Sequence, residues 1–384
     1  MNFDLTPDQK LLVETAASFV KKESPPARVR KLRDDPIGWS KPLWKRMGDM
    51  GWLGILFGEE VGGFGGTFVD AALLLEQFGT TLVPEPYVPS VILGGTAITR
   101  VGDAAQRERW LAPVVAGDAT LALAWAEAAG RYDATRVGTR AERAGAGWRL
   151  RGRKELVLCG HAADAMVVTA RTSGGEADRE GISLFVIARG ASGVGVRPVT
   201  TIDGHRAAIV TFDGAEIGGD ALLGAEGGAA ALLDELMDLG AAAACAEGAG
   251  LMRAALTMTL EYLRTREQFG VRIGSFQALQ HRAVDMFVET ELAKSTSILA
   301  SIKVSDPDPF ERASAISAAK VQLAIAGRFV TQQAIQLHGG IGVTDEHDIG
   351  LYFKRMHALN AMFGDEEFHL ARFARLPSFT AGLG

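Results

Sequence analysis

The spacing of hydrophobic and polar residues changes twice along this chain of 384 residues. Near the N-terminus, apolar positions recur every three or four residues, at Leu12, Ala16 and Phe19, as on one face of a helix. From residue 120 to about residue 223, short apolar runs alternate with glycine-rich turns, as strands require. Helical spacing resumes at Ala229 and persists almost to the end. The pattern therefore predicts helices, then a small sheet, then helices.

The first helix has a clear start signal. Thr6 is a suitable N-cap, Pro7 takes the first helical position, and Gln9 closes a capping box. The glycine run at 62–66 has neither G-x-G-x-x-G after a strand nor a Gly-Lys-Ser/Thr ending, so we expect a tight loop and no phosphate loop. Further helices are expected at Trp44–Met50, Phe68–Phe78 and Ala104–Val115.

Composition changes near Asp118, where the short strands begin. We expect domains at residues 1–117, 118–225 and 226–384. The Asp306–Pro309 segment is expected to link two helices of the last domain. Strands of the middle domain are expected at 148–151, 165–170, 182–187, 194–199 and 208–212.

The chain is organised around the stretch 262–286. A helix with Tyr262 on its buried face is expected to stop at Phe269–Gly270, because glycine tolerates a left-handed C-cap. Ser275 is a reasonable N-cap for the next helix. Arg266 and Gln268 then lie with Phe269 where one long helix turns into the next. These side chains suit an anionic, partly aromatic ligand, although an ordinary capped helical hairpin has the same spacing.

Two motifs carry a family resemblance. Residues 266–280 read R-x-Q-F-G-x-x-I-x-x-F-Q-x-x-Q, which resembles the signature of the acyl-CoA dehydrogenases. The likeness implies that FAD, largely that of a neighbouring subunit, is contacted by Arg266, Gln268, Phe269 and Gln277. The segment Q-L-H-G-G at 336–340 resembles a second family signature. It implies that Gln336, Gly339 and Gly340 lie against the partner's FAD, whereas His338 is expected to be a packed residue.

The resemblance covers nearly the whole chain and sets the wider expectations. It implies an α+β fold with an N-terminal helical domain, a central small β-barrel domain and a C-terminal four-helix bundle. The implied reaction is desaturation of an acyl-CoA thioester at Cα–Cβ, with FAD as cofactor and electron-transfer flavoprotein as acceptor. It also implies a homo- or hetero-oligomer, a dimer of dimers.

The middle domain departs from the family pattern. Ala126–Asp133 stands where a typical member has T-E-P-G-A-G-S-D, and Leu156 stands where the family has a tryptophan. These changes put the usual flavin contacts of this domain in doubt, so cofactor binding would rest more on the C-terminal helices. The R-Y-D form at 131–133 resembles the small subunit of pimeloyl-CoA dehydrogenases and related heteromeric enzymes.

The catalytic base is not evident. Phe363 occupies the place of the family's glutamate in its E-G-T motif, and Gly240 falls at a second known position for the base. Glu247 lies about two helical turns from Gly240, so it shares a face with that position. Its apolar helix should raise its pKa, as a base near neutrality needs. A structural carboxylate paired with an arginine is the alternative.

Asp365 and Glu366 are the next candidates for the base. The chain could also hold no base and act as a non-catalytic or half-catalytic subunit that completes a partner's FAD site. A third alternative is an acyl-CoA- or DNA-binding relative. Related nitroalkane oxidases have an aspartate at the position of the base, so Asp365 could serve as the base of such an oxidase.

Composition narrows these alternatives. With 47% hydrophobic and 22% charged residues, the chain has an ordinary globular composition. The net charge of −6 and the absence of a basic run argue against nucleic acid as a partner. Cys159 and Cys245 are far apart and neither belongs to C-x-x-C, so no zinc site and no disulfide is expected. We see no secretory signal and no membrane span, and we expect a cytoplasmic protein.

Overall fold

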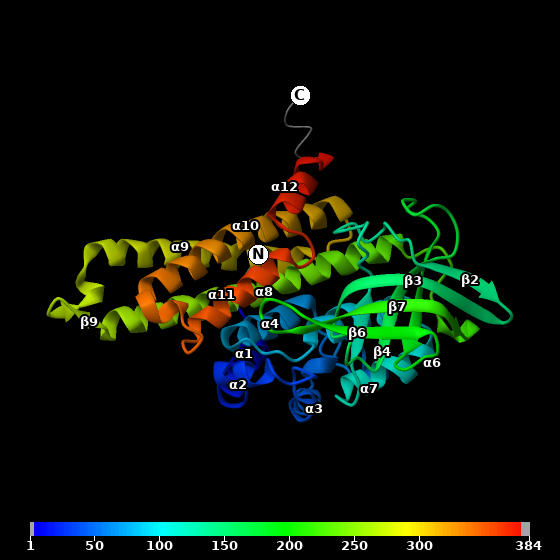
Figure 1. The fold of residues 1–384 in the computed structure, drawn as a ribbon, viewed down its shortest axis with the longest axis horizontal. Coiled ribbons are helices and arrows are strands. Elements are labelled where there is room, and N and C mark those ends of the chain that lie inside the picture. Colours follow the sequence, from blue (N-terminus) through cyan, green and yellow to red (C-terminus); the bar gives the residue numbers. More distant parts are fainter. Residues whose placement is uncertain (1–3, 378–384) are drawn as a thin grey trace. The chain divides into compact units, whose positions relative to one another are not determined.

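A computed structural model describes residues 4–377 (Figure 1). Contacts between residues divide the chain into two units. The helical unit comprises Met1–Arg33, Phe68–Val83 and Ala241–Gly384, and the sheet unit comprises Asp34–Thr67 and Pro84–Gly240. Each unit thus gathers segments that are distant in sequence. The domain boundaries expected after residues 117 and 225 stay predictions.

The helical unit is built around long helices. α10 packs against α9, α11 and α12, and α1 packs against α4. The capping box of α1 is confirmed, because the Thr6 hydroxyl accepts from the Gln9 backbone at 3.2 Å while the Gln9 side chain accepts from the Thr6 backbone at 3.1 Å. The α-helices are α1 (Pro7–Glu23), α2 (Pro26–Leu32), α4 (Phe68–Thr81), α8 (Ala230–Thr265, shared with the sheet unit), α9 (Gln277–Lys303), α10 (Pro309–His338), α11 (Ile349–Ala361) and α12 (Glu366–Ala374). Two short 3-10 helices, η6 (Ile273–Ser275) and η7 (Gly339–Val343), belong to the same unit.

A short β-hairpin joins α8 to α9, which corrects two expectations. α8 ends at Thr265 and not at Phe269, and strands β9 (Glu267–Gln268) and β10 (Val271–Arg272) pair antiparallel. Phe269 (φ +57°) and Gly270 (φ +78°) form the two-residue turn, and positive φ at both positions is typical of a type I′ hairpin. Ser275 is not the N-cap of α9, because that position belongs to Phe276 and the Ser275 hydroxyl donates to the Arg272 carbonyl at 2.7 Å.

The sheet unit contains an eight-stranded sheet with the order β6-β7-β3-β2-β4-β5-β8, in which β1 pairs with β4. Trp148 and Phe185, both at most 1% exposed, contact edge to face in its core. β1, β2 and the two-residue β8 were not predicted. The strands are β1 (Leu121–Ala124), β2 (Arg140–Ala144), β3 (Gly147–Leu158), β4 (Ala165–Arg171), β5 (Ile182–Ala188), β6 (Val194–Thr200), β7 (Arg206–Ile217) and β8 (Leu222–Leu223).

Helices of the sheet unit are short. The helix expected over Ala104–Val115 is α6 (Ala104–Gln106), a π-helical segment η4 (Arg107–Leu111) and α7 (Ala112–Val115). The glycine run is a loop beginning after η2 (Glu59–Val61), as expected. The remaining helices are α3 (Lys41–Asp49), η1 (Trp52–Gly54), η3 (Val88–Gly95), α5 (Thr96–Val101) and η5 (Gly219–Ala221).

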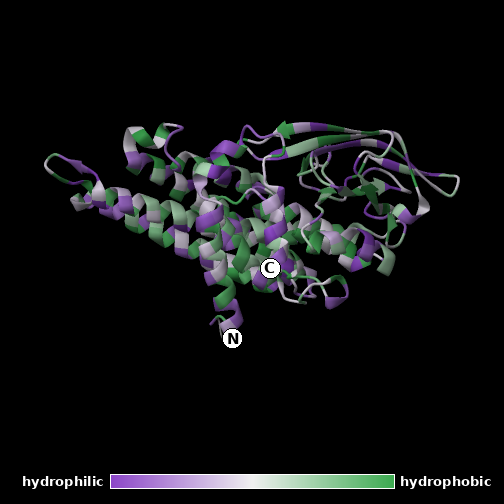
Figure 2. Cartoon of the chain, turned by 90° about the horizontal axis from the view of Figure 1, so that it is seen from below, coloured by the Kyte–Doolittle hydropathy of each residue, from purple (hydrophilic) through white to green (hydrophobic). Residues whose placement is uncertain are grey.

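Hydrophobic and hydrophilic residues are interleaved along the long helices (Figure 2). Within residues 4–377, no helix is long and apolar enough to cross a membrane. α9 nevertheless carries a second apolar stripe besides its buried one. We call it the outer face of α9; its members are between 47% and 58% exposed and are Val284, Phe287, Val288 and Leu292. An exposed stripe of this kind commonly marks a protein–protein contact.

Candidate cofactor and substrate site

The hairpin after α8 presents three of the predicted cofactor residues. Phe269 is 90% exposed and meets Phe276 edge to face, with ring centroids 6.1 Å apart. Arg266 is exposed, and its guanidinium forms no hydrogen bond or ion pair with any residue in the described part of the chain. The Gln268 amide donates to the Glu267 carbonyl at 2.8 Å, which leaves its oxygen open.

The second motif lies at the end of α10. Gly339 caps this helix with φ +62°, and a Cβ added at Gly339 or Gly340 would meet no described atom within 4 Å. Gln336 is exposed one turn earlier, and Gln277 is exposed at the start of α9. The predicted contact residues therefore form open surface that another molecule can approach.

An aromatic stack brings the two motifs together. His338 is 1% exposed and stacks on Tyr262, four residues before Arg266, with ring centroids 4.7 Å apart. Its Nδ1 lies 2.7 Å from the Ala334 carbonyl, to which it donates in the neutral ring. Burial lowers the pKa of His338, so the ring is neutral near pH 7. His338 is a packing residue that joins the end of α8 to the end of α10.

The donors at this end of the bundle fit a dinucleotide. An unpaired guanidinium suits a pyrophosphate, and a carboxamide can both donate to and accept from an adenine edge. The turn glycines leave room for close approach of a backbone or ring. Arg266, Gln268, Gln277 and Gly340 would therefore hold part of FAD, while Phe269 supplies an aromatic face.

The sheet unit fits a flavin ring less well. Leu156 adopts φ +47° at an irregularity in the β3–β7 pairing, and it is 51% exposed. A left-handed leucine is strained by roughly 1–2 kcal/mol, and strain of this kind is often found at ligand sites. The backbone thus presents a side chain outward at the place of the family's tryptophan, but that side chain is aliphatic.

A buried ion pair holds the divergent Ala126–Asp133 segment on the sheet. The Lys154 ammonium is 0% exposed and donates to Glu127 at 2.5 Å and to the Thr169 hydroxyl at 2.7 Å. Glu127 also accepts from the Thr139 backbone at 3.0 Å. Burial lowers the pKa of Lys154 to about 8, although the nearby Glu127 charge opposes that shift. The segment therefore keeps a fixed position despite its unusual sequence.

Glu247 is engaged by an arginine. Its carboxylate accepts two hydrogen bonds from Arg355 on α11, from Nε at 2.6 Å and from Nη2 at 2.8 Å. Glu247 is 5% exposed and Arg355 is 7% exposed. This is the arrangement of the structural alternative, a carboxylate paired across the bundle. No sequence pattern marks Arg355 as the partner, because it lies 108 residues away.

The other two candidate carboxylates also have local partners. Asp365 is the N-cap of α12, where it accepts from the Phe368 backbone at 2.9 Å. Glu366 pairs with Arg328 at 3.0 Å on the surface. All three acids of the predicted catalytic set thus contribute to local structure.

The turn at the family's glutamate position is held by two buried side chains. Phe363 is 7% exposed with φ +56°, and Gly364 has φ +109°. The Lys320 ammonium donates to the carbonyls of Leu359 at 2.8 Å and Met362 at 2.9 Å. Nε2 of His369 lies 3.0 Å from the Phe363 carbonyl and donates to it in the neutral ring.

Burial shifts the titration of both side chains. It lowers the pKa of Lys320 to about 8 and that of His369 to about 3. Sequence reasoning missed both residues. Lys320 could have been noticed as the one charge between Arg312 and Arg328, whereas no pattern marks His369.

The pKa of His369 predicts a loss of stability in acid. Below pH 6.5, the ordinary histidine pKa, His369 binds a proton in the unfolded chain. In the folded chain it does not bind this proton until the pH falls to about 3. The free energy of unfolding should therefore fall as pH decreases from 6.5 toward 3. His369→Gln should remove this part of the slope in urea denaturation, whereas His357→Gln at an exposed position should keep it. Equal slopes for the two variants would contradict the assignment.

The buried ion pair predicts an asymmetric response to mutation. Glu247→Gln leaves the Arg355 charge without its partner and should lower the free energy of unfolding by about 3–5 kcal/mol. The double variant Glu247→Leu/Arg355→Leu should recover most of that loss, because neither charge remains buried. Chemical denaturation measures both.

Glu366→Gln is the matched control, since it breaks the exposed pair with Arg328 and should change stability by at most about 1 kcal/mol. If Glu247→Gln unfolded like the wild type, the pair would not be structural and Glu247 would regain its place as a candidate base.

Comparison with known proteins identifies the family. Models of the acyl-CoA dehydrogenase N-terminal, middle and C-terminal domains match residues 6–118, 122–215 and 226–376. The acyl-CoA dehydrogenase IpdE2 of Mycolicibacterium smegmatis is 30% identical to this chain over 372 residues, which cover 96% of this chain and 98% of the relative.

Solved structures agree with the sequence matches. Butyryl-CoA dehydrogenase from Megasphaera elsdenii is 25% identical, with a TM-score of 0.91 over 100% of both chains. A chain of the ChsE4-ChsE5 complex from Mycobacterium tuberculosis is 28% identical, with a TM-score of 0.87 over 98% of both chains. These matches confirm the predicted α+β fold, the enzyme class, an oxidoreductase acting on CH–CH groups, and FAD as the cofactor. The chain therefore belongs to the acyl-CoA dehydrogenase family.

Proposed function

We propose that this chain works in an oligomer that desaturates an acyl-CoA thioester at Cα–Cβ, and that its C-terminal residues complete the FAD site of a neighbouring chain. The observation that carries the proposal is the exposed hairpin. Arg266 has no partner within residues 4–377, and Phe269 is 90% exposed beside it. A guanidinium with no partner in its own chain and an exposed ring are both free to bind an anionic, partly aromatic molecule, to which the guanidinium can make strong charge-assisted hydrogen bonds.

Each residue of the set has a distinct task in this proposal. Arg266 binds the pyrophosphate as a fork-shaped cation, and the carboxamides of Gln268, Gln277 and Gln336 orient the ring edges of the cofactor. Gly339 and Gly340 admit the cofactor at the end of α10. FAD, when bound, supplies the chemistry that accepts the hydride from Cβ.

The outer face of α9 supports the oligomer. Its four apolar residues are spaced along one side of the helix that begins directly after the cofactor hairpin. A second chain packed on this face would bring its own cofactor near the hairpin of the first. We propose a dimer of dimers in the cytoplasm, with electron-transfer flavoprotein as the acceptor.

A second candidate function is favoured by the engaged carboxylates. Desaturation needs a base for the α-proton, yet Phe363 stands at the family's glutamate position and Glu247 is bound to Arg355. The chain would then be the half-catalytic subunit of a heteromeric dehydrogenase, and a non-identical partner would supply the base. In the first candidate function, one of Glu247, Asp365 and Glu366 leaves its structural partner and acts as the base.

Replacing Arg266 should weaken cofactor binding. Arg266→Ala should lower the FAD content of the purified oligomer at least tenfold, because a charged hydrogen bond to the pyrophosphate is lost. Arg266→Lys should have an FAD content between those of the wild type and Arg266→Ala, because lysine keeps the positive charge but lacks the forked pair of N–H donors. Flavin absorbance per chain measures the occupancy.

Two further variants serve as controls. Arg264→Ala removes an exposed arginine two residues earlier and should leave FAD content unchanged. Gly340→Ala adds a methyl that meets no described atom of its own chain, so a loss of FAD without a loss of chain stability would locate the cofactor there. Full FAD content in Arg266→Ala would exclude the pyrophosphate role.

Flavin bleaching distinguishes the two candidate functions. If the chain lacks a base, the protein purified alone should keep its flavin colour during anaerobic titration with a panel of acyl-CoA thioesters. Phe363→Glu, which restores the family's acid, should then gain bleaching by at least one thioester. Bleaching of the wild-type chain alone would show that it has its own base and would rule out the second candidate.

A further inference from the structure

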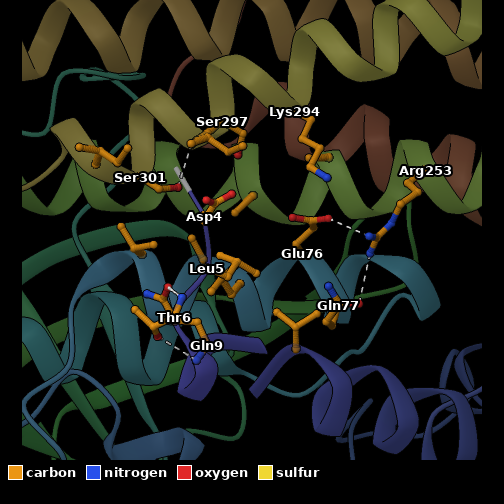
Figure 3. Close-up of a pocket in the computed structure, with 18 residues that line it drawn as sticks. Asp4, Leu5, Thr6, Gln9, Glu76, Gln77, Arg253, Lys294, Ser297 and Ser301 are labelled. Atoms are coloured by element: carbon orange, nitrogen blue, oxygen red, sulfur yellow. Dashed lines mark hydrogen bonds and ion pairs between the residues drawn. The ribbon is translucent and has the colours of Figure 1, made fainter. Parts of the chain in front are cut away.

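A cavity of about 560 Å³ lies within the helical unit, among α1, α4, α8 and α9 (Figure 3). Its lining residues recur every three or four positions along α4, α8 and α9, so the cavity runs along these helices. Three alanines hold it open, because a larger side chain at Ala72, Ala246 or Ala249 would fill the space. Its volume is within the usual range for small-molecule sites. None of its lining residues belongs to the predicted FAD set.

Two polar groups of α9 face the cavity without a partner. Ser297 is 5% exposed, yet its hydroxyl forms no hydrogen bond with any described residue. Lys294 lies one turn earlier on the same face, and its ammonium forms no ion pair across residues 4–377. Figure 3 shows Lys294 reaching from α9 toward the space above Glu76. A hydroxyl and a cation on one side of α9 therefore both line the cavity, and neither has a partner among the described residues.

The other charges of the lining limit which ligand can enter. Arg253 is already paired with Glu76 at 3.0 Å and bonded to Gln77 at 3.2 Å. Asp4 is a second carboxylate at the wall. Asp4 and Glu76 balance Arg253 and Lys294 in formal charge, so the wall opposes a dianion such as a phosphate more strongly than a monoanion held at the Lys294 ammonium.

Thr6, Gln9, Gln77 and Ser301 also line the wall, and each of these side chains has a hydrogen-bond partner within the chain. Most of the remaining wall is aliphatic. The aliphatic side chains come from the segment before α1 and from α1, α4 and α9, and they are Leu5, Val13, Val69, Leu73, Ile298 and Ile302. A flexible hydrocarbon chain matches such a wall, because its burial removes apolar surface from water on both sides.

We propose that this cavity binds a medium-chain aliphatic carboxylate. The carboxylate lies between the Lys294 ammonium and the Ser297 hydroxyl, and the hydrocarbon chain lies along Val69, Leu73 and Ile298. The site is separate from the proposed FAD surface, so the binding does not depend on the dehydrogenase function.

Octanoate binding to the FAD-loaded oligomer tests the proposal by isothermal titration calorimetry. Octanoate should bind saturably, and octan-1-ol should bind at least tenfold more weakly, because it cannot form the charged hydrogen bond to Lys294. Lys294→Met should weaken octanoate binding about tenfold and should bring it close to that of the alcohol. Lys21→Met, at an exposed position of α1, is the matched control and should bind like the wild type.

Filling the cavity separates this site from any acyl-binding site of the enzyme. Val69→Trp places a large ring at a partly exposed position of the wall and should abolish octanoate binding while the flavin spectrum stays unchanged. The proposal is overturned if octanoate does not bind the oligomer, if Val69→Trp binds it normally, or if Lys294→Met and Lys21→Met bind it equally.

Discussion

One buried ion pair constrains how the helices of the helical unit are arranged. Glu247 is the only charge of α8 between Asp238 and Arg253, and it meets Arg355 of α11 in a two-point contact at 2.6 and 2.8 Å. A charge in such a helix is stable only when paired, so the pair fixes how α8 and α11 face each other. Close backbone contact fixes α4 as well, since a Cβ at Gly250 would lie 1.8 Å from the Glu76 carbonyl.

Two sites of the helical unit follow from this packing. At the end of α8 and α10, the Tyr262–His338 stack gathers the hairpin and the α10 turn into one open surface, on which the Arg266 guanidinium has no partner within residues 4–377. Beside the middle of α10, Lys320 and His369 hold the turn that carries Phe363 in a left-handed conformation. The chain thus keeps the surface that suits a cofactor, while its acids contribute to packing and capping.

The cofactor surface and the turn at Phe363 differ in the functional groups that they carry. The cofactor surface keeps the Arg266 guanidinium without a partner in the described part of the chain, whereas the Gln268 amide has only a local bond to the Glu267 carbonyl. The turn at Phe363 keeps the strained backbone but has lost the carboxylate. Strain is retained where the surrounding contacts enforce it, and here Lys320 and His369 supply those contacts. A cofactor surface without a carboxylate at the turn is the combination expected of a subunit that contributes to a shared flavin site and relies on a partner for the base.

The sequence alone determined the local features. The capping box at Thr6, the change from helical to strand spacing near residue 120, the linker before Pro309 and the glycine cap at Gly339 depend on neighbours within a few residues, and the structure contains each of them. The R-x-Q-F-G motif likewise located the exposed surface and the family.

Only the tertiary structure decided the roles of the acids. Arg355 lies 108 residues from Glu247, and no spacing rule connects them. The hairpin at 267–272 was missed because two-residue strands have no alternation to detect, and Phe269, expected where the helix stops, lies in the left-handed turn of that hairpin. Lys320 and His369 act through carbonyls of a distant segment, and any residue type offers a carbonyl. Contacts of this kind depend on where the backbone lies in space, so the sequence carries no local mark of them.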